Sequence, residues 1–259
     1  MSFGQLALIS LAGFAAGAVN ALAGGGTLII FPVLVAAGFP AIVANITGTI
    51  ALCPGFLGAT YAQRAQLRGQ RARLQVLLPL SLLGGLLGAM LILRTGERKF
   101  TQAVPWLLLG ACALLASQER LRGLLSARRA RAGESAVVAR TEPLWLLALL
   151  VVVTMYGGFF GAGMSVIILA VLGLALTDPL PRLNALKQAI ALATNFAAAS
   201  WLALRAPVDW PVVAVLALSA LVGGVWGGRL AGRLSALWLR RTVVFFGVVV
   251  AAAYLWRTR

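Results

Sequence analysis

The stretch NALAGGGTLIIFPVL at residues 20–34 places three consecutive glycines between two apolar runs. Each glycine costs about 1 kcal/mol relative to alanine inside a helix. The triplet therefore predicts a break in an apolar helix, followed by a new short helix. A second stretch, GAGMSVII at residues 161–168, repeats the pattern of glycines before a short apolar run. These two breaks decide the predicted fold.

The composition is that of an integral membrane protein. Hydrophobic residues make up 61% of the 259 residues and charged residues 11%, whereas about a quarter of a soluble domain is charged. The apolar runs are mostly long enough for helices that cross a bilayer, and they do not alternate as barrel strands do. We expect an all-α, multi-pass protein of the cell's cytoplasmic (inner) membrane.

Ten apolar segments are expected, two of them short. They lie at residues 5–22, 27–38, 40–61, 75–93, 101–117, 144–156, 164–176, 183–204, 211–228 and 242–256. At 1.5 Å per residue, the second and seventh segments are too short to span the membrane. They are predicted to be broken or re-entrant half-helices, which gives eight to ten transmembrane segments in all.

The net charge of +16 comes from arginines that cluster between the apolar runs. Such clusters are typical of cytoplasmic loops, so we expect no nucleic acid partner. The chain has no histidine, and its two cysteines, Cys53 and Cys112, are far apart. Without a histidine base or a carboxylate pair in an apolar segment, we expect neither an enzyme nor a cofactor or metal site.

The chain divides into two similar halves. We predict a first transmembrane repeat at residues 1–117, a basic cytoplasmic linker at 118–143 and a second repeat at 144–259. The aligned pairs are GGGTLII (24–30) with GAGMSVII (161–168), TIALCPGFLGATYA (49–62) with AIALATNFAAASWL (189–202), and LLGGLLGAML (82–91) with LVGGVWGGRL (221–230). Five segments is an odd number, so the second repeat is expected to insert inverted relative to the first.

The breaks predict an anion site, because the N-terminus of a half-helix carries free N–H groups and a partial positive charge. Lys187 is a candidate charge partner, and the alternative is a lysine that extends to the interface. The hydroxyls of Thr27 and Ser165 are expected to cap the short helices. The candidate substrate-binding residues are Gly24, Gly25, Gly26, Thr27, Asn45, Thr47, Gly161, Gly163, Ser165, Asn184, Lys187 and Gln188.

Glycines elsewhere have a different expected role. Small residues let transmembrane helices pack closely. Helix packing is the role expected for Gly84, Gly88, Gly224, Gly228 and Gly232.

The sequence resembles the TauE/SafE family of sulfite-exporter-like permeases. The resemblance rests on GFAAGAVNALAGGGTLIIFPVLVAAGFPAIVANITGTIAL (13–52) and YGGFFGAGMSVIILAVLGLALTDPLPRLNALKQAIALATN (156–195). It implies export of sulfite or a small organosulfonate. The second stretch carries Leu186-Lys187-Gln188 where the family more commonly has Gly-Thr.

We therefore expect a secondary transporter of a small sulfur-containing anion, working by alternating access at a midplane site between the repeats. The expected partners are a small anionic substrate and the lipid bilayer, and a homodimer is compatible with the sequence. The alternatives are a permease or channel for another solute or ion, and a non-transporting membrane scaffold or intramembrane enzyme.

Overall fold

The computed structural model describes residues 3–22, 24–132, 142–230, 244–245 and 247–252, which are helical apart from short turns and contain no strand. The helices are α1 (Phe3–Leu22), α2 (Thr27–Ala36), α3 (Ala41–Ala62), the 3₁₀ helix η1 (Arg64–Leu67), α4 (Arg71–Thr95), α5 (Glu97–Ala132), α6 (Leu144–Phe159), α7 (Met164–Ala175), α8 (Leu180–Arg205) and α9 (Trp210–Leu230). The prediction of an all-α membrane protein is confirmed.

Five of the described helices are long and apolar enough to cross a membrane: α1, α3, α4, α9 and the first part of α5. Helices α2 and α7 have only 10 and 12 residues. At 1.5 Å per residue they reach about 15 and 18 Å, well short of a hydrocarbon layer of about 30 Å. The two predicted short segments are therefore confirmed as short helices.

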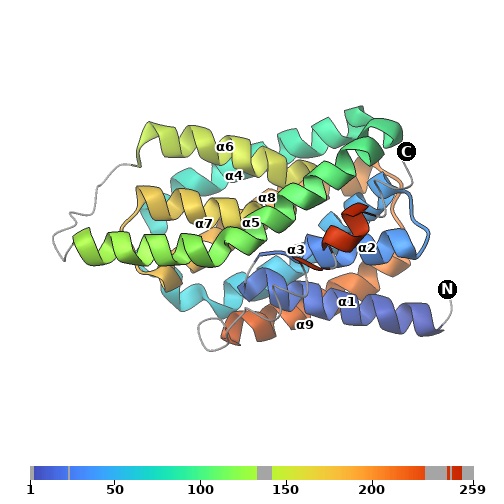
Figure 1. Cartoon of the computed structure of the whole chain (residues 1–259), viewed down its shortest axis with the longest axis horizontal. Coiled ribbons are helices and arrows are strands. Elements are labelled where there is room, and N and C mark those ends of the chain that lie inside the picture. Colours follow the sequence, from blue (N-terminus) through green and yellow to red (C-terminus); the bar gives the residue numbers. More distant parts are fainter. Residues whose placement is uncertain (1–2, 23, 133–141, 231–243, 246, 253–259) are drawn as a thin grey trace.

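The helices form two groups that each combine both halves of the chain. Helix α1 packs along α9, and α9 also packs on α3; helix α6 packs along α4, which also packs on α8. In Figure 1, α1 and α9 lie along one side of the molecule and α4 and α6 along the other. The fourth helix of each half thus packs against the first and third helices of the other half.

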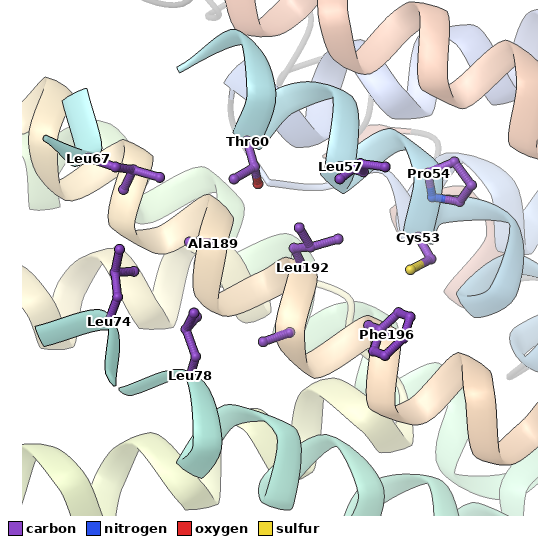
Figure 2. Close-up of a pocket in the computed structure, with 11 residues that line it drawn as sticks. Cys53, Pro54, Leu57, Thr60, Leu67, Leu74, Leu78, Ala189, Leu192 and Phe196 are labelled. Carbon is purple, nitrogen blue, oxygen red and sulfur yellow. The ribbon is translucent and has the colours of Figure 1, made fainter. Parts of the chain in front are cut away.

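The two groups meet where α3 contacts α8. Figure 2 shows Thr60 opposite Ala189 and Cys53 opposite Phe196. Residue numbers rise along α3 as they fall along α8, so the two helices run antiparallel. They are the corresponding third helices of the two halves.

Glycines allow the close packing within each group. A Cβ atom on Gly85 of α4 would overlap the carbonyl oxygen of Thr194 on α8, and one on Gly224 of α9 would overlap the carbonyl oxygen of Gly55 on α3. Cβ atoms on Gly84 and Gly88 of α4 would likewise overlap carbonyl oxygens of α6, those of Val151 and Met155. Cβ atoms on the aligned Gly223 and Gly227 of α9 would overlap carbonyl oxygens of α1, those of Phe14 and Ala18. The aligned glycines therefore make equivalent contacts.

The packing role predicted for the helical glycines is confirmed where the structure describes them. Gly84, Gly88 and Gly224 lie against neighbouring backbone, and a Cβ on Gly228 would come within 2.8 Å of the Ala62 Cβ. Gly232 lies outside the described residues, as do residues 242, 243, 246 and 253–256 of the tenth predicted segment, 242–256.

Helix α5 differs from the expected segment 101–117, because it begins at Glu97 and continues to Ala132. The first part of the predicted linker 118–143 is thus helical. Its sequence there, RLRGLLSARRARA, is rich in Leu, Ala and Arg, which are strong helix formers and can continue a helix beyond the bilayer. Polarity alone did not distinguish a helix from a loop here. The division into two repeats stays a prediction.

An aromatic ring and an arginine pair at the end of the third helix in each half, with Arg64 lying just after α3 in η1. The Arg64 guanidinium lies 4.0 Å from the centre of the Tyr61 ring, and the Arg205 guanidinium lies 4.5 Å from that of Trp201. Aromatic and basic side chains of this kind are typical of the membrane–water interface. They indicate that the ends of α3 and α8 lie at interface level.

Comparing two alanine substitutions tests the glycine contacts. We expect Gly85→Ala to lower the free energy of unfolding by roughly 1–3 kcal/mol, because the added Cβ overlaps backbone. Gly110→Ala in α5 is the control, since nothing lies within 4 Å of a Cβ there. Thermal unfolding in detergent measures both, and an equal loss of stability in the two variants would contradict the packing role.

Candidate functional site

The two glycine breaks meet inside the molecule. Gly24 and Gly161 have φ values of +83° and +75°, which glycine adopts without the penalty that a Cβ brings. A Cβ on Gly24 would overlap that of Ser165, and one on Gly161 would lie 3.9 Å from the Thr27 hydroxyl oxygen. Each break therefore lies beside the start of the short helix of the other half.

A side chain from the preceding helix holds each break. Asn20 Oδ1 accepts a hydrogen bond of 2.7 Å from the backbone N–H of Gly26. The Tyr156 hydroxyl donates one of 2.6 Å to the carbonyl oxygen of Ala162. In both cases the partner lies six residues further along the chain. The two bonds satisfy backbone groups that the broken helices leave open.

Amide side chains from the opposite half bind the ends of the broken helices. Gln188 Nε2 donates to the carbonyl oxygens of Asn20 and Ala21, both at 3.0 Å. Asn45 Nδ2 donates to the carbonyl oxygen of Phe159 at 3.0 Å. Helix α8 thus binds the end of α1, and α3 binds the end of α6, so each break is stabilised by the other half.

Lys187 is fully buried, with 0% of its surface exposed. A lysine that extended to the interface would be partly exposed, so this alternative is wrong. Lys187 precedes Gln188, whose side chain reaches the first break. Asn45 and Thr47 on α3 are buried as well.

Several buried polar atoms of α1, α3 and α8 have no hydrogen-bond partner among the described residues, and Asn20, Asn45 and Gln188 also bind backbone at the breaks. Two of them are donors, Asn20 Nδ2 and Thr47 Oγ1, and two are acceptors, Asn45 Oδ1 and Gln188 Oε1. A buried polar atom without a partner is costly. The unmet hydrogen bonds of these residues include both donors and acceptors.

The predicted hydroxyl caps of the short helices are wrong. The N-cap positions are Gly26 and Gly163, and no side chain caps either helix. Asn20 supplies the oxygen that binds the Gly26 N–H instead, while Ser165 packs against Gly24. At the start of α2, Asn20 from the preceding helix thus takes the place of a hydroxyl cap.

Gly25 and Gly163 lie against α5. A Cβ on Gly25 would come within 2.9 Å of Leu115 Cδ2, and one on Gly163 within 3.3 Å of Ala111 Cα. Gly163 has a positive φ of +77°, whereas Gly25 does not have a positive φ. The left-handed backbone favours glycine at position 163, whereas a Cβ at position 25 would meet the end of the Leu115 side chain.

Asn184 has a different environment from the other predicted residues. Its Nδ2 donates a 2.6 Å hydrogen bond to Gln63 Oε1 at the end of α3. This bond joins the first turns of α8 to the last turn of α3.

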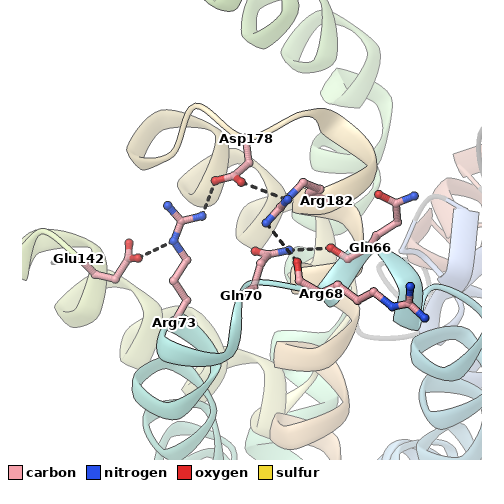
Figure 3. Close-up of polar contacts among 7 residues, drawn as sticks. All are labelled: Gln66, Arg68, Gln70, Arg73, Glu142, Asp178 and Arg182. Atoms are coloured by element: carbon pink, nitrogen blue, oxygen red, sulfur yellow. Dashed lines mark hydrogen bonds and ion pairs between the residues drawn. The ribbon is translucent and has the colours of Figure 1, made fainter. Parts of the chain in front are cut away.

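Asp178 also lies outside the region of the breaks, in a cluster of ion pairs (Figure 3). Arg73 bonds to Asp178 and, at 2.8 Å, to Glu142. Arg182 Nε lies 3.2 Å from the other Asp178 oxygen. The cluster joins the start of α4 to residues that precede α6 and α8. Its two carboxylates are compensated by arginines at a helix end.

Two residues at the breaks were not among the predicted site residues. Asn20 is the first residue of the quoted stretch 20–34 and was given no role, and Tyr156 was not singled out. The signal that could have found them is their shared spacing, because each binds a backbone group six residues later, at Gly26 and Ala162.

Comparing two glycines with positive φ tests the contact between the breaks. Gly24 and Gly38 have φ values of +83° and +95°, but nothing lies within 4 Å of a Cβ on Gly38. Alanine at either position should cost about 1–2 kcal/mol for the left-handed backbone. We expect Gly24→Ala to lose more stability in thermal unfolding, because its Cβ also meets Ser165. Equal losses would argue against tight contact between the breaks.

Comparison with known proteins agrees with this architecture. The family model described as Sulfite exporter TauE/SafE matches residues 9–254. A Haemophilus influenzae protein described as a probable membrane transporter protein is 27% identical over 250 residues, which cover 95% of this chain and 93% of that protein. No solved structure matches the chain. The chain belongs to the TauE/SafE family and is a multi-pass protein of a membrane transporter family.

Proposed function

We propose that the protein is a secondary transporter that exports a small sulfur-containing anion, such as sulfite or an organosulfonate, across the cytoplasmic membrane. Membership of the TauE/SafE family supports transport, and the description of its family model suggests the class of substrate. The observation that carries the proposal is the meeting of the two breaks beside the chain segment that holds the buried Lys187.

An anion fits the charges near the breaks. Two short helices begin there, and helix N-termini carry partial positive charge. Lys187 is the charged residue among the buried polar residues of the described chain. The acidic residues Glu142, Asp178 and Asp209 lie before helix starts, away from the middle of the spanning helices. A buried positive charge beside two helix N-termini favours an anionic ligand over a cation.

The unpartnered atoms narrow the class of ligand. Asn20 Nδ2 and Thr47 Oγ1 can donate to sulfur-bound oxygens, while Asn45 Oδ1 and Gln188 Oε1 can only accept. A monoprotonated oxyanion or an aminosulfonate supplies both acceptors and a donor. This favours hydrogen sulfite or an aminoalkylsulfonate over a fully deprotonated anion such as sulfate.

Alternating access requires two bodies that move relative to each other. We propose that the repeats are inverted, which the equivalent glycine contacts and the antiparallel α3 and α8 support. The moving bodies would then be the two packing groups, α1–α3–α9 and α4–α6–α8, because close backbone contacts lie within each group. The α3–α8 contact is where they would shift.

A ligand panel tests the substrate class. We expect sulfite or taurine to raise the thermal unfolding midpoint of the purified protein, with sulfate and sulfoacetate giving smaller shifts because neither carries a hydrogen-bond donor at neutral pH. Binding stabilises a folded protein in proportion to the logarithm of ligand concentration over Kd. A shift from none of these anions would contradict the proposal and favour a transporter of another solute.

Lys187 provides a test of the anion site itself. Lys187→Met keeps the length of the side chain and removes its charge, so we expect at least a ~10-fold weaker apparent affinity, about 1.4 kcal/mol. Lys187→Arg should lose less. Lys99→Met is the matched control, because Lys99 is exposed at the start of α5. Ligand titration of thermal stability and flux into liposomes measure the effect, and normal transport by Lys187→Met would exclude this role.

A further inference from the structure

We propose that a groove between α3, α4 and α8 holds an acyl chain of an anionic phospholipid, whose phosphate is bound by the arginines around η1. The groove has a volume of about 640 Å³. Figure 2 shows it beside the α3–α8 crossing. It is lined by Cys53, Pro54, Leu57, Thr60, Leu67, Leu74, Leu78, Ala189, Leu192, Ala193 and Phe196.

The lining suits a hydrocarbon chain. Only Thr60 contributes a hydroxyl, and the other lining side chains are apolar or a thiol. From Cys53 to Thr60 on α3, and from Ala189 to Phe196 on α8, the walls run about 10 Å along each helix. Leu67 and Leu74 extend the groove beyond the end of α3. Its elongated shape matches an extended acyl chain better than a compact polar solute.

The groove opens onto the surface that faces lipid. Leu57 and Phe196 on its rim are 54% and 58% exposed, and they lie in the second halves of α3 and α8, inside the helix ends. At this level the surroundings of the protein are acyl chains. An unfilled groove would deprive its lining of van der Waals contacts.

Positive charge lies at one end of the groove. Leu67 and Leu74 flank the turn from η1 to α4, where Arg64, Arg68 and Arg71 are exposed. The nearby carboxylates Glu142 and Asp178 bond to other arginines, Arg73 and Arg182. In Figure 3 the Arg68 side chain points away from Asp178. Among the described residues, the ion pairs of these acids thus involve Arg73 and Arg182 and none of the three exposed arginines.

This end of the groove also lies at headgroup level. Tyr61 is 57% exposed, and Arg64 lies over its ring at 4.0 Å. Such aromatic and basic pairs are typical of the membrane interface. A chain lying between Cys53 and Leu67 would thus place its phosphate near the three arginines.

Selection among lipids must come from the headgroup. An acyl chain gains little by leaving one apolar environment for another, so the groove alone does not distinguish phospholipids. Each basic residue near the surface favours an anionic lipid by about fivefold. The proposal is thus an anionic phospholipid, and it does not depend on which solute is transported.

The experiment uses Cys53 as a reporter inside the groove. The Cys112→Ala variant leaves Cys53 as the only cysteine of the chain, and Cys53 is partly exposed. The full chain is labelled there with bimane and reconstituted with phosphatidylcholine. Lipids with brominated acyl chains, carrying either a glycerol or a choline headgroup, then quench the label. We expect at least about a fivefold preference for phosphatidylglycerol.

Two matched triple variants decide the role of the arginines. Arg64→Gln, Arg68→Gln and Arg71→Gln together should abolish the preference while quenching by phosphatidylcholine remains. Arg94→Gln, Arg98→Gln and Lys99→Gln, at the turn between α4 and α5, should keep it. Native mass spectrometry of the unlabelled protein measures retained lipid independently. Equal quenching by both lipids, or a preference that survives the first variant, would overturn the proposal. Quenching by neither lipid would also overturn it, and a dimeric sample would then assign the groove to a second copy.

Discussion

The structure depends on satisfying the backbone where two helices break inside an apolar protein. Unpaired N–H and C=O groups at membrane depth are tolerated only where protein or a wet cavity provides partners. Here the partners come from both halves of the chain, and the ends of the broken helices are bound by the other half. Gln188 binds the end of α1 and Asn45 binds the end of α6. Neither half completes its own break, so the two must be assembled together.

This exchange requires the helices to approach closely. The contact of Gly85 with Thr194 brings α4 against α8, and that of Gly224 with Gly55 brings α9 against α3. Within a bilayer such contacts rest on packing rather than on the hydrophobic effect. The glycines of α4 and α9 therefore support the geometry that brings the breaks together, although they lie in other helices.

The two packing groups place the proposed anion site and the lipid groove in the same part of the molecule. Helices α3 and α8 carry the polar residues that bind the broken helices, and they also form the walls of the apolar groove. A lipid chain in that groove would contact both groups. Movement along the α3–α8 interface would then change the shape of the groove together with access to the breaks.

Local features of the amino-acid sequence were sufficient for the helical elements near the breaks. Consecutive glycines, short apolar runs and the prolines at positions 40 and 179 predict helix ends, because each acts on its own stretch of backbone. The length of α5 was missed, since a polar, Arg-rich stretch can be either a loop or a helix that leaves the bilayer. The burial of Lys187, the bond from Asn45 to Phe159 and the contact between Gly24 and Ser165 were decided by tertiary structure alone. The two contacts join residues more than a hundred positions apart. Both contacts, and the burial of Lys187, depend on how helices from both halves pack.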